Sequence, residues 1–265
     1  MKYNMITTID QTKKLYRYIP FRRFKEMLET GCIAASNPAR WPDEYELFWL
    51  MNLSTEEGIE ALSERMKEGV AEKDIEKVNA SVLHLCKMIY QSEFAICFSE
   101  NEDAEVLWRA YSDNTSSTIM LSSDVGRIAR LGMDNKENGD WSINKVCYDL
   151  TGNDFNEFLN RITIVPGKIS IFNPRDFFLH KRSDFAYEQE YRMLIEPQEF
   201  SDIPKERIYL RINDLSEFIT GVMVHPLAED SLVQEVRQLC DKYELVFQGK
   251  SEIYKYKPSW PIKRK

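Results

Sequence analysis

The sequence predicts an α+β fold, with mixed and mainly antiparallel β-sheets, flanking helices and a helical hairpin inserted at about residues 54–92. Short apolar segments with strand character occur in clusters, and helical periodicities lie between them at uneven spacing. A regular alternation of strand and helix, which is typical of parallel sheets, is missing. The 265 residues are close to the upper size for one hydrophobic core, so we expect a single domain over residues 1–265.

The N-terminal part is expected to contain strands around one helix and the hairpin. Pro20 stands where a helix can begin and Gly31 where it can end. Ser54 and Glu57 have the spacing of a capping box, which would open the first hairpin helix. Between the first helix and the hairpin, Asn37–Glu46 has two prolines and mixed charge, which predicts a loop. The expected strands here are Lys14–Ile19, Cys32–Ser36, Glu93–Ser99 and Ser117–Ser122, with a short helix carrying Leu107, Trp108 and Tyr111.

The C-terminal part is expected to supply the remaining strands and two helices. Apolar residues recur at helical spacing in Asn153–Ile164 and Glu229–Tyr243. Ile169–Phe178 is irregular around Pro174. The expected strands are Lys145–Asp149, Phe185–Ile195, Arg207–Ile212, Ile219–Val224, Leu245–Gln248 and Glu252–Tyr256.

Composition excludes several classes of protein. Five scattered cysteines favour reduced thiols over disulfides or zinc, and three widely separated histidines make a metal site improbable. The net charge of −8 argues against a broad nucleic-acid surface, so nucleic acid is an unlikely partner. No apolar run has the length of a membrane helix or of a signal segment, so we expect a soluble, cytoplasmic protein. No glycine-rich phosphate loop is present, which disfavours ATP or Rossmann-type NAD binding.

Phe185–Ile195 is the most informative segment. On a strand, alternate side chains share a face, so Glu188, Glu190 and Arg192 would form one charged row. Two neighbouring carboxylates disfavour joint ionisation, and Arg192 can offset that effect. Two interpretations remain open: an edge strand with a solvated ion-pair face, or a Glu-x-Glu catalytic strand.

Several short motifs occur in a specific order along the chain. They are LYRY at 15–18, Pro-Asp-x-x-Glu at 42–46, CFSE at 97–100, LWRAY at 107–111 and YEQEYRMLI at 187–195. This ordered set resembles the bacterial family called domain of unknown function 2971, over essentially the whole chain. Two departures are clear: the loop lacks the Asn that precedes Asp in the family, and Trp108 lacks the Met that often precedes the family's Trp.

The order of Arg17, Ser99 and the Glu188–Glu190 pair also resembles the Arg-Ser-Glu ADP-ribosyltransferases, which implies an ADP-ribosyltransferase-like fold and NAD as substrate, with no metal. Cleavage of the nicotinamide–ribose bond builds positive charge on the ribose, which a fixed carboxylate stabilises. Glu190 would face that cation, and Glu188 would activate the incoming nucleophile. The acceptor could be protein, nucleic acid, small molecule or water.

The remaining candidate residues would bind NAD. The predicted site comprises Glu190 and Glu188 for catalysis, and Arg17, Ser99, Trp108, Arg109, Tyr111 and Arg192 for binding. Arg17 would hold the pyrophosphate, Ser99 would brace the glutamate, and Trp108 or Tyr111 would stack on a flat ring. Arg109 and Lys181 are further possible phosphate contacts. Each has a structural alternative: Arg17 as an ion-pair partner of Glu190, Ser99 as a helix N-cap, Trp108 and Tyr111 as core residues, and the lone basic residues as surface groups.

Three classes of function therefore remain open. The first is an NAD-consuming transferase or glycohydrolase, and the second is a non-catalytic module that binds a nucleotide-like ligand. The third is an interaction protein or an effector in phage defence. The enzyme requires Arg17, Ser99 and Glu190 to converge, with Glu190 unpaired or paired to Arg17 alone.

Overall fold

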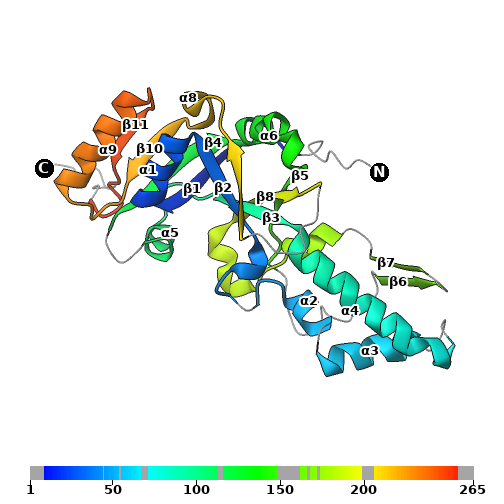
Figure 1. Cartoon of the computed structure of the whole chain (residues 1–265). Helices are drawn as coiled ribbons and strands as arrows, with labels where there is room; N and C mark the ends of the chain where they lie inside the picture. Colours follow the sequence, from blue (N-terminus) through cyan, green and yellow to red (C-terminus); the bar gives the residue numbers. More distant parts are fainter. Residues whose placement is uncertain are drawn as a thin grey trace, which may run out of the picture. The chain divides into compact units, whose positions relative to one another are not determined.

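A computed structural model describes residues 9–43, 45–53, 55–66, 71–112, 116–148, 162–165, 168–171, 174–198 and 206–255. It confirms the α+β class, because strands with mainly antiparallel pairing are accompanied by helices (Figure 1). The chain divides into two compact units, and each is described by itself. Unit 1 comprises Met1–Asp10, Ile33–Cys97 and Ala129–Arg211, and unit 2 comprises Gln11–Cys32, Phe98–Ile128 and Ile212–Lys265.

Unit 2 is built on the strands β11, β10, β4 and β1, in that order. The first motif lies on β1 (Lys14–Pro20), which pairs antiparallel with β4 (Thr118–Asp124). β4 pairs antiparallel with β10 (Gly221–Val224), and β10 pairs parallel with β11 (Phe247–Lys250). The helices of this unit are α1 (Phe21–Thr30), α5 (Glu105–Ala110), α8 (Leu215–Phe218) and α9 (Asp230–Lys242).

Local chemistry explains where α1 begins and ends. Pro20 precedes its first residue, and Gly31 follows its last residue in the left-handed conformation with φ of 62°. The Gly31 N–H donates to the Met27 carbonyl at 2.9 Å, which satisfies one of the free carbonyls of the last turn. The predicted helix boundaries are therefore confirmed.

Unit 1 contains β5 (Asp140–Lys145), β8 (Glu190–Glu196) and β9 (Arg207–Arg211). It also contains most of β2 (Cys32–Ser36), whose first residue belongs to unit 2, and most of β3 (Phe94–Ser99), whose last two residues belong to unit 2. β3 lies beside β2 and β8, and β8 also pairs antiparallel with β5. A separate antiparallel pair is formed by β6 (Ile162–Val165) and β7 (Lys168–Ile171). The α-helices are α2 (Phe48–Leu53), α3 (Glu56–Met66) and α4 (Ile75–Ser92); α6 (Val125–Asp134) has residues in both units.

The core of unit 1 joins α2, α3 and α4 to the strands. Its buried members are apolar side chains that lie far apart in the sequence: Leu47, Leu50, Leu53, Leu62, Cys86, Ile89, Ala95, Phe177, Phe178, Leu179 and Leu194. Burial of this apolar surface is the main favourable contribution to folding of the unit.

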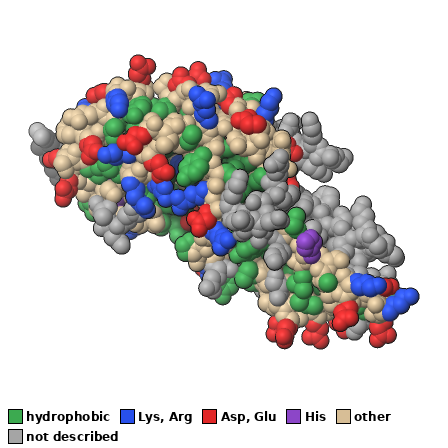
Figure 2. All heavy atoms as spheres, viewed as in Figure 1, with side chains coloured by type: hydrophobic (Ala, Val, Ile, Leu, Met, Phe, Trp, Pro, Cys, Tyr) green, Lys and Arg blue, Asp and Glu red, His purple; other side chains and the backbone are tan. Residues whose placement is uncertain are grey.

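The region expected to form the helical hairpin contains α3 and α4. The Ser63 hydroxyl and the Asn79 amide link them, with Asn79 Nδ2 donating to Ser63 Oγ at 2.9 Å. Ser54 of the predicted capping box lies outside the described residues. Thr55 Oγ1 accepts the Gly58 N–H at 3.1 Å. The exposed edge of the hairpin is acidic, as Figure 2 shows at the lower right, and α3 contributes four exposed glutamates to it: Glu56, Glu57, Glu60 and Glu64.

The segment Phe185–Ile195 differs from its prediction. Ser183–Glu188 forms a 3-10 helix, Gln189 adopts the left-handed conformation with φ of 43°, and β8 begins only at Glu190. The continuous strand predicted over Phe185–Ile195 is therefore wrong in its first half. Because Glu188 lies before the strand, alternation along a strand does not determine its direction. The alternative of a solvated charged face is also wrong, since Arg192 is 0% and Glu190 3% exposed.

Other expectations fail for local reasons. The strand expected over Lys145–Asp149 is displaced, because β5 ends at Lys145 and Cys147 forms only an isolated bridge with His180. Ile162–Val165 is a strand, so the end of the helix expected over Asn153–Ile164 is wrong, and the rest of that helix lies outside the described residues. Ile253–Lys255 is a turn rather than a strand. In the described ranges, no helix has both the length and the apolar character needed to cross a membrane.

Candidate functional site

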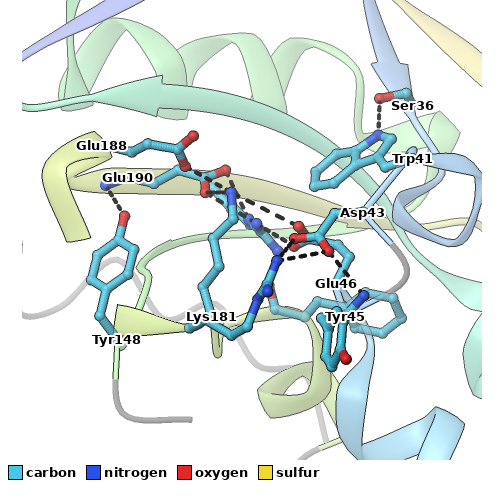
Figure 3. A network of polar contacts seen from close by, with 12 residues as sticks. Ser36, Trp41, Asp43, Tyr45, Glu46, Tyr148, Lys181, Glu188 and Glu190 are labelled. Atoms are coloured by element: carbon cyan, nitrogen blue, oxygen red, sulfur yellow. Dashed lines mark hydrogen bonds and ion pairs between the residues drawn. The ribbon is translucent and has the colours of Figure 1, made fainter. Parts of the chain in front are cut away.

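Five charged side chains form a buried network in unit 1 (Figure 3). They are Glu46 from the loop before α2, Lys181 and Glu188 from the segment before β8, and Glu190 and Arg192 from β8 itself. All five residues are buried. Charges in such surroundings remain stable only when they are paired and hydrogen-bonded, so the contacts within the network decide what it can do.

Glu190 and Arg192 form the centre of the network. Arg192 Nε donates to Glu190 Oε1 at 2.9 Å, and Nη2 donates to Glu190 Oε2 at 3.0 Å. Arg192 Nη1 donates to the Phe178 carbonyl at 2.7 Å. A planar guanidinium that meets a carboxylate at two points forms one of the stronger ion pairs in proteins. The two side chains thus hold each other in one orientation.

Lys181 connects Glu190 to two further carboxylates. Its ammonium nitrogen lies 2.7 Å from Glu188 Oε2, 3.3 Å from Glu190 Oε2 and 3.8 Å from Glu46 Oε2. Figure 3 shows the second oxygen of Glu188 pointing away from Lys181. The pairing of Glu190 with both Arg192 and Lys181 does not meet the requirement set by the sequence for an enzyme, in which Glu190 is unpaired or paired to Arg17 alone.

The loop that carries Pro-Asp-x-x-Glu belongs to the same network. Glu46 forms an ion pair with Arg192, and the Trp41 ring lies 5.0 Å from the Arg192 guanidinium. Asp43 forms an ion pair with Arg182 at 3.2 Å. Sequence analysis assigned no role to Glu46 and treated Lys181 as a lone basic residue. The signal that could have found Glu46 was its place in the family-like motif.

The CFSE motif also contacts Glu190. The Cys97 side chain, from the CFSE motif on β3, hydrogen-bonds to Glu190 and helps to lower its pKa. The backbone of Glu190 is fixed as well: its N–H donates to the Tyr148 hydroxyl at 2.7 Å, and its carbonyl accepts the Val146 N–H at 2.9 Å. Side chain and main chain therefore both anchor this glutamate.

The three carboxyl groups of the network differ in pKa. Burial acts to raise the pKa of Glu190, but Arg192 and Lys181 outweigh burial and lower it to about 2. Burial raises the pKa of Glu188, against the opposing charge of Lys181. Burial also raises the pKa of Glu46, although Arg192 and Lys181 act against it. Glu190 is thus ionised at neutral pH, whereas Glu46 and Glu188 take up protons more readily than ordinary glutamates.

Arg17 and Ser99 lie in unit 2 and point in different directions. Tyr16 of β1 is directly opposite Ser99 of β3 in the antiparallel pair, so Tyr16 and Ser99 share a face and Arg17 lies on the other one. The Arg17 guanidinium accordingly lies over the Phe98 ring, 5.9 Å from its centre. The structure does not bring these two predicted site residues together. Ser99 is not the N-cap of α5 either, because Ala104 holds that position and Ser99 Oγ accepts the Asn101 N–H at 2.9 Å.

The other predicted ligand-binding residues of unit 2 lie on or near α5. Trp108 is 0% exposed; its Nε1 donates to Asp103 Oδ1 at 2.8 Å and its ring packs edge-on against Tyr18 at 4.9 Å. This burial supports the core alternative over ring stacking with a ligand. Tyr111 is partly exposed and stacks with Tyr18 at 6.5 Å. Arg109 is exposed and forms an ion pair with Glu105 at 2.7 Å.

Within the part of the chain that the structure describes, no group of three or more His, Cys, Asp or Glu side chains is arranged to hold a metal ion. The charged groups of the described network are three carboxylates, one ammonium and one guanidinium.

No family model and no curated protein sequence matches the chain, so the resemblance to the unknown-function 2971 family depends on the sequence motifs. Among solved structures, Thermus sp. 2.9 DarT in complex with NAD+ is similar with a TM-score of 0.38 and 8% identity, covering 91% of this chain and 98% of that one. The complex with carba-NAD+ has a TM-score of 0.37 and 7% identity, covering 90% and 96%. The complex with ADP-ribosylated single-stranded DNA has a TM-score of 0.36 and 7% identity, covering 91% and 96%.

Proposed function

We propose that the protein is an ADP-ribosyltransferase-like enzyme that cleaves the nicotinamide–ribose bond of NAD, with the Glu188–Glu190 segment at the reacting centre. In this reaction the bond between ribose C1 and the nicotinamide nitrogen breaks, and its electron pair leaves with nicotinamide. A nucleophile then supplies an electron pair to C1 and loses its proton to a base. The acceptor is an unidentified macromolecule, a small molecule or water.

The charge balance of the buried network carries this proposal. Three carboxylates, Glu46, Glu188 and Glu190, face two cations, Lys181 and Arg192, so the fully ionised network has one negative charge in excess. A cationic ribose, formed as nicotinamide departs, would supply the missing positive charge. Fixed charges that complement a charge developing in the transition state are the largest source of rate enhancement in many enzymes.

The two glutamates of the segment are suited to different parts of this work. Glu190 is ionised at neutral pH, with its pKa lowered to about 2 by Arg192 and Lys181 despite burial, and it keeps the local potential negative. Glu188 has a raised pKa because it is buried, as suits a group that exchanges a proton with the nucleophile. Both roles are parts of the proposal.

The test is nicotinamide release from NAD by the purified full chain. Wild type, Glu188→Gln, Glu190→Gln and the exposed control Glu57→Gln are compared after circular dichroism has shown that each is folded. We expect release by wild type and by the control, and a loss of roughly 100-fold or more in the two site variants. Absence of release by wild type, without any NAD-induced shift in Tm, overturns the proposal.

A second function is favoured by one observation. Arg192 occupies both oxygens of Glu190 and Lys181 shares one of them, which suits a rigid binding site better than a carboxylate poised for chemistry. A non-catalytic protein that binds a nucleotide-like ligand is therefore the alternative. It predicts that NAD or a related nucleotide raises the Tm by mass action while no nicotinamide is released.

A further inference from the structure

We propose that Lys181 is a positioning residue of this site, which aims the Glu188 carboxylate and keeps it ionised while Glu46 and Glu190 hold the ammonium in place. The inference rests on the proposed function and deepens it, because it assigns a role to a residue that the Glu-x-Glu motif does not include. It also connects the loop before α2, through Glu46, to the reacting segment.

Carboxylates surround the Lys181 ammonium. A lysine ammonium has three N–H donors and no acceptor. Three carboxylate oxygens surround it, at 2.7 Å from Glu188, 3.3 Å from Glu190 and 3.8 Å from Glu46. The contacts with Glu188 and Glu190 are hydrogen bonds, whereas the contact with Glu46 is an ion pair without a hydrogen bond. Because the lysine is also buried, its ammonium is committed to these carboxylates. Lys181 therefore acts on a substrate through Glu188 rather than as the phosphate contact that its sequence context suggested.

Backbone hydrogen bonds fix the main chain of Lys181. The Lys181 N–H donates to the Cys147 carbonyl at 2.9 Å, and the Cys147 N–H donates to the Leu179 carbonyl at 2.7 Å. These bonds tie the segment before β8 to the residues that follow β5. Since Tyr148 also accepts the Glu190 N–H, the same short stretch fixes both the lysine and the glutamate that share the ion pair.

The Phe185 ring lies beside the Lys181 ammonium. The Phe185 ring centre lies 4.9 Å from Lys181 Nζ, at a distance suited to a cation–π contact. The next residue along the chain, Arg182, lies over the same ring at 5.1 Å and pairs with Asp43. In such a partly dehydrated setting the attraction between Lys181 and Glu188 is stronger than at a surface. Loss of the ammonium would leave three carboxylates facing Arg192 alone.

The experiment measures the pH dependence of nicotinamide release by Lys181→Met and Lys181→Arg. Without the ammonium, Glu188 takes up a proton more easily, so the acidic limb of the profile should move to higher pH by roughly one to three units in Lys181→Met. Lys181→Arg preserves the charge and should restore the wild-type limb. A purely structural lysine would lower the rate without moving the limb, and an unmoved limb in folded Lys181→Met overturns the inference.

A second readout separates this inference from the proposed function. In protein labelled with ¹³C at glutamate carboxyl carbons, Glu188 is assigned by the signal missing in Glu188→Gln, and its titration is followed by NMR. We expect the Glu188 titration to move to higher pH in Lys181→Met, or in Lys181→Gln if the methionine variant does not fold. A shifted titration in a protein that releases no nicotinamide leaves the role of Lys181 standing and rejects the NAD reaction. An unchanged titration rejects the role of Lys181.

Discussion

Arg192 holds Glu190 from two positions farther along the same strand, with Nε–Oε1 and Nη2–Oε2 distances of 2.9 and 3.0 Å. Residues two apart on a strand share a face, so β8 carries both partners of its own buried ion pair. Glu46 and Lys181 then attach the loop before α2 and the segment before β8 to that pair. The pair is thus the point at which three separate stretches of chain are joined.

Removal of one partner of the Glu190–Arg192 ion pair should destabilise the protein. We expect Glu190→Gln to lower the free energy of unfolding by about 3–5 kcal/mol at pH 7, because Arg192 and Lys181 would lose a buried counter-charge. Urea denaturation followed by circular dichroism measures the change, and exposed Glu57→Gln is the control. A loss below about 1 kcal/mol would show that solvent reaches the pair and screens it.

The same pair predicts how stability responds to acid. The pKa of Glu190 falls from 4.5 to about 2 on folding, because Arg192 and Lys181 outweigh burial. A group with a depressed folded pKa contributes stability that is present above its unfolded pKa and lost as the pH falls through the folded value. The stability gap between wild type and Glu190→Gln should therefore narrow between about pH 4.5 and pH 2. A gap that stays constant over that window would contradict the assignment.

Glu93, between α4 and β3, predicts the opposite dependence of stability on pH. Burial raises its pKa to about 8, although Arg175 bonds one of its oxygens at 3.0 Å. A raised folded pKa contributes stability below the unfolded value, and that contribution is lost as the pH rises through the folded value. The free energy of unfolding of Glu93→Gln, relative to that of wild type, should therefore rise by about 1 kcal/mol or more between pH 5 and pH 9. Thermal unfolding at the two pH values measures this change.

A control for Glu93 is available on the same arginine. Glu196 also contacts Arg175, at 3.4 Å, and its side chain is much more exposed than that of Glu93. Glu196→Gln should leave the pH dependence of stability close to that of wild type. If the two variants respond alike, the effect belongs to the charge of Arg175 rather than to the burial of Glu93.

Substitutions at Gln189 test whether a turn precedes β8. Its left-handed backbone suits glycine and opposes β-branched residues, so Gln189→Gly should change stability by less than about 1 kcal/mol, whereas Gln189→Val should lose on the order of 1–2 kcal/mol. The glycine variant also loses the bond from Gln189 Nε2 to the Ala186 carbonyl. In an uninterrupted strand valine would be the better residue. A stability order with valine above glycine would contradict the observed turn.

Trp108 provides a test in unit 2. Trp108→Phe keeps a large ring but removes the donor to Asp103, so it should cost about 1 kcal/mol of stability. A double-mutant cycle with Asp103→Ala isolates this bond, and a coupling energy near zero would show that it contributes nothing. Because the indole is fully buried, we expect Trp108→Phe to leave any NAD-induced shift in Tm unchanged.

The sequence by itself determined the class of fold and most of the element positions. Alternating residues in the first strand, the Pro20 and Gly31 boundaries of α1 and the helical stripe of α9 are all local patterns, and local chemistry fixes such elements. It also singled out Glu188, Glu190 and Arg192 as a charged group. These predictions depended only on the spacing of residues close together in the sequence, and such local patterns do not require knowledge of tertiary contacts.

Only the tertiary structure decided how those charges are paired. Glu46 and Lys181 lie 135 positions apart and share one buried cluster with Glu190, and no local pattern encodes that meeting. The left-handed residue at Gln189 removes Glu188 from the strand, so counting alternate positions gave it the wrong place. The strand register then set Arg17 and Ser99 on opposite faces. Register and long-range ion pairs depend on contacts between distant segments, and for that reason spacing along the chain could not predict them.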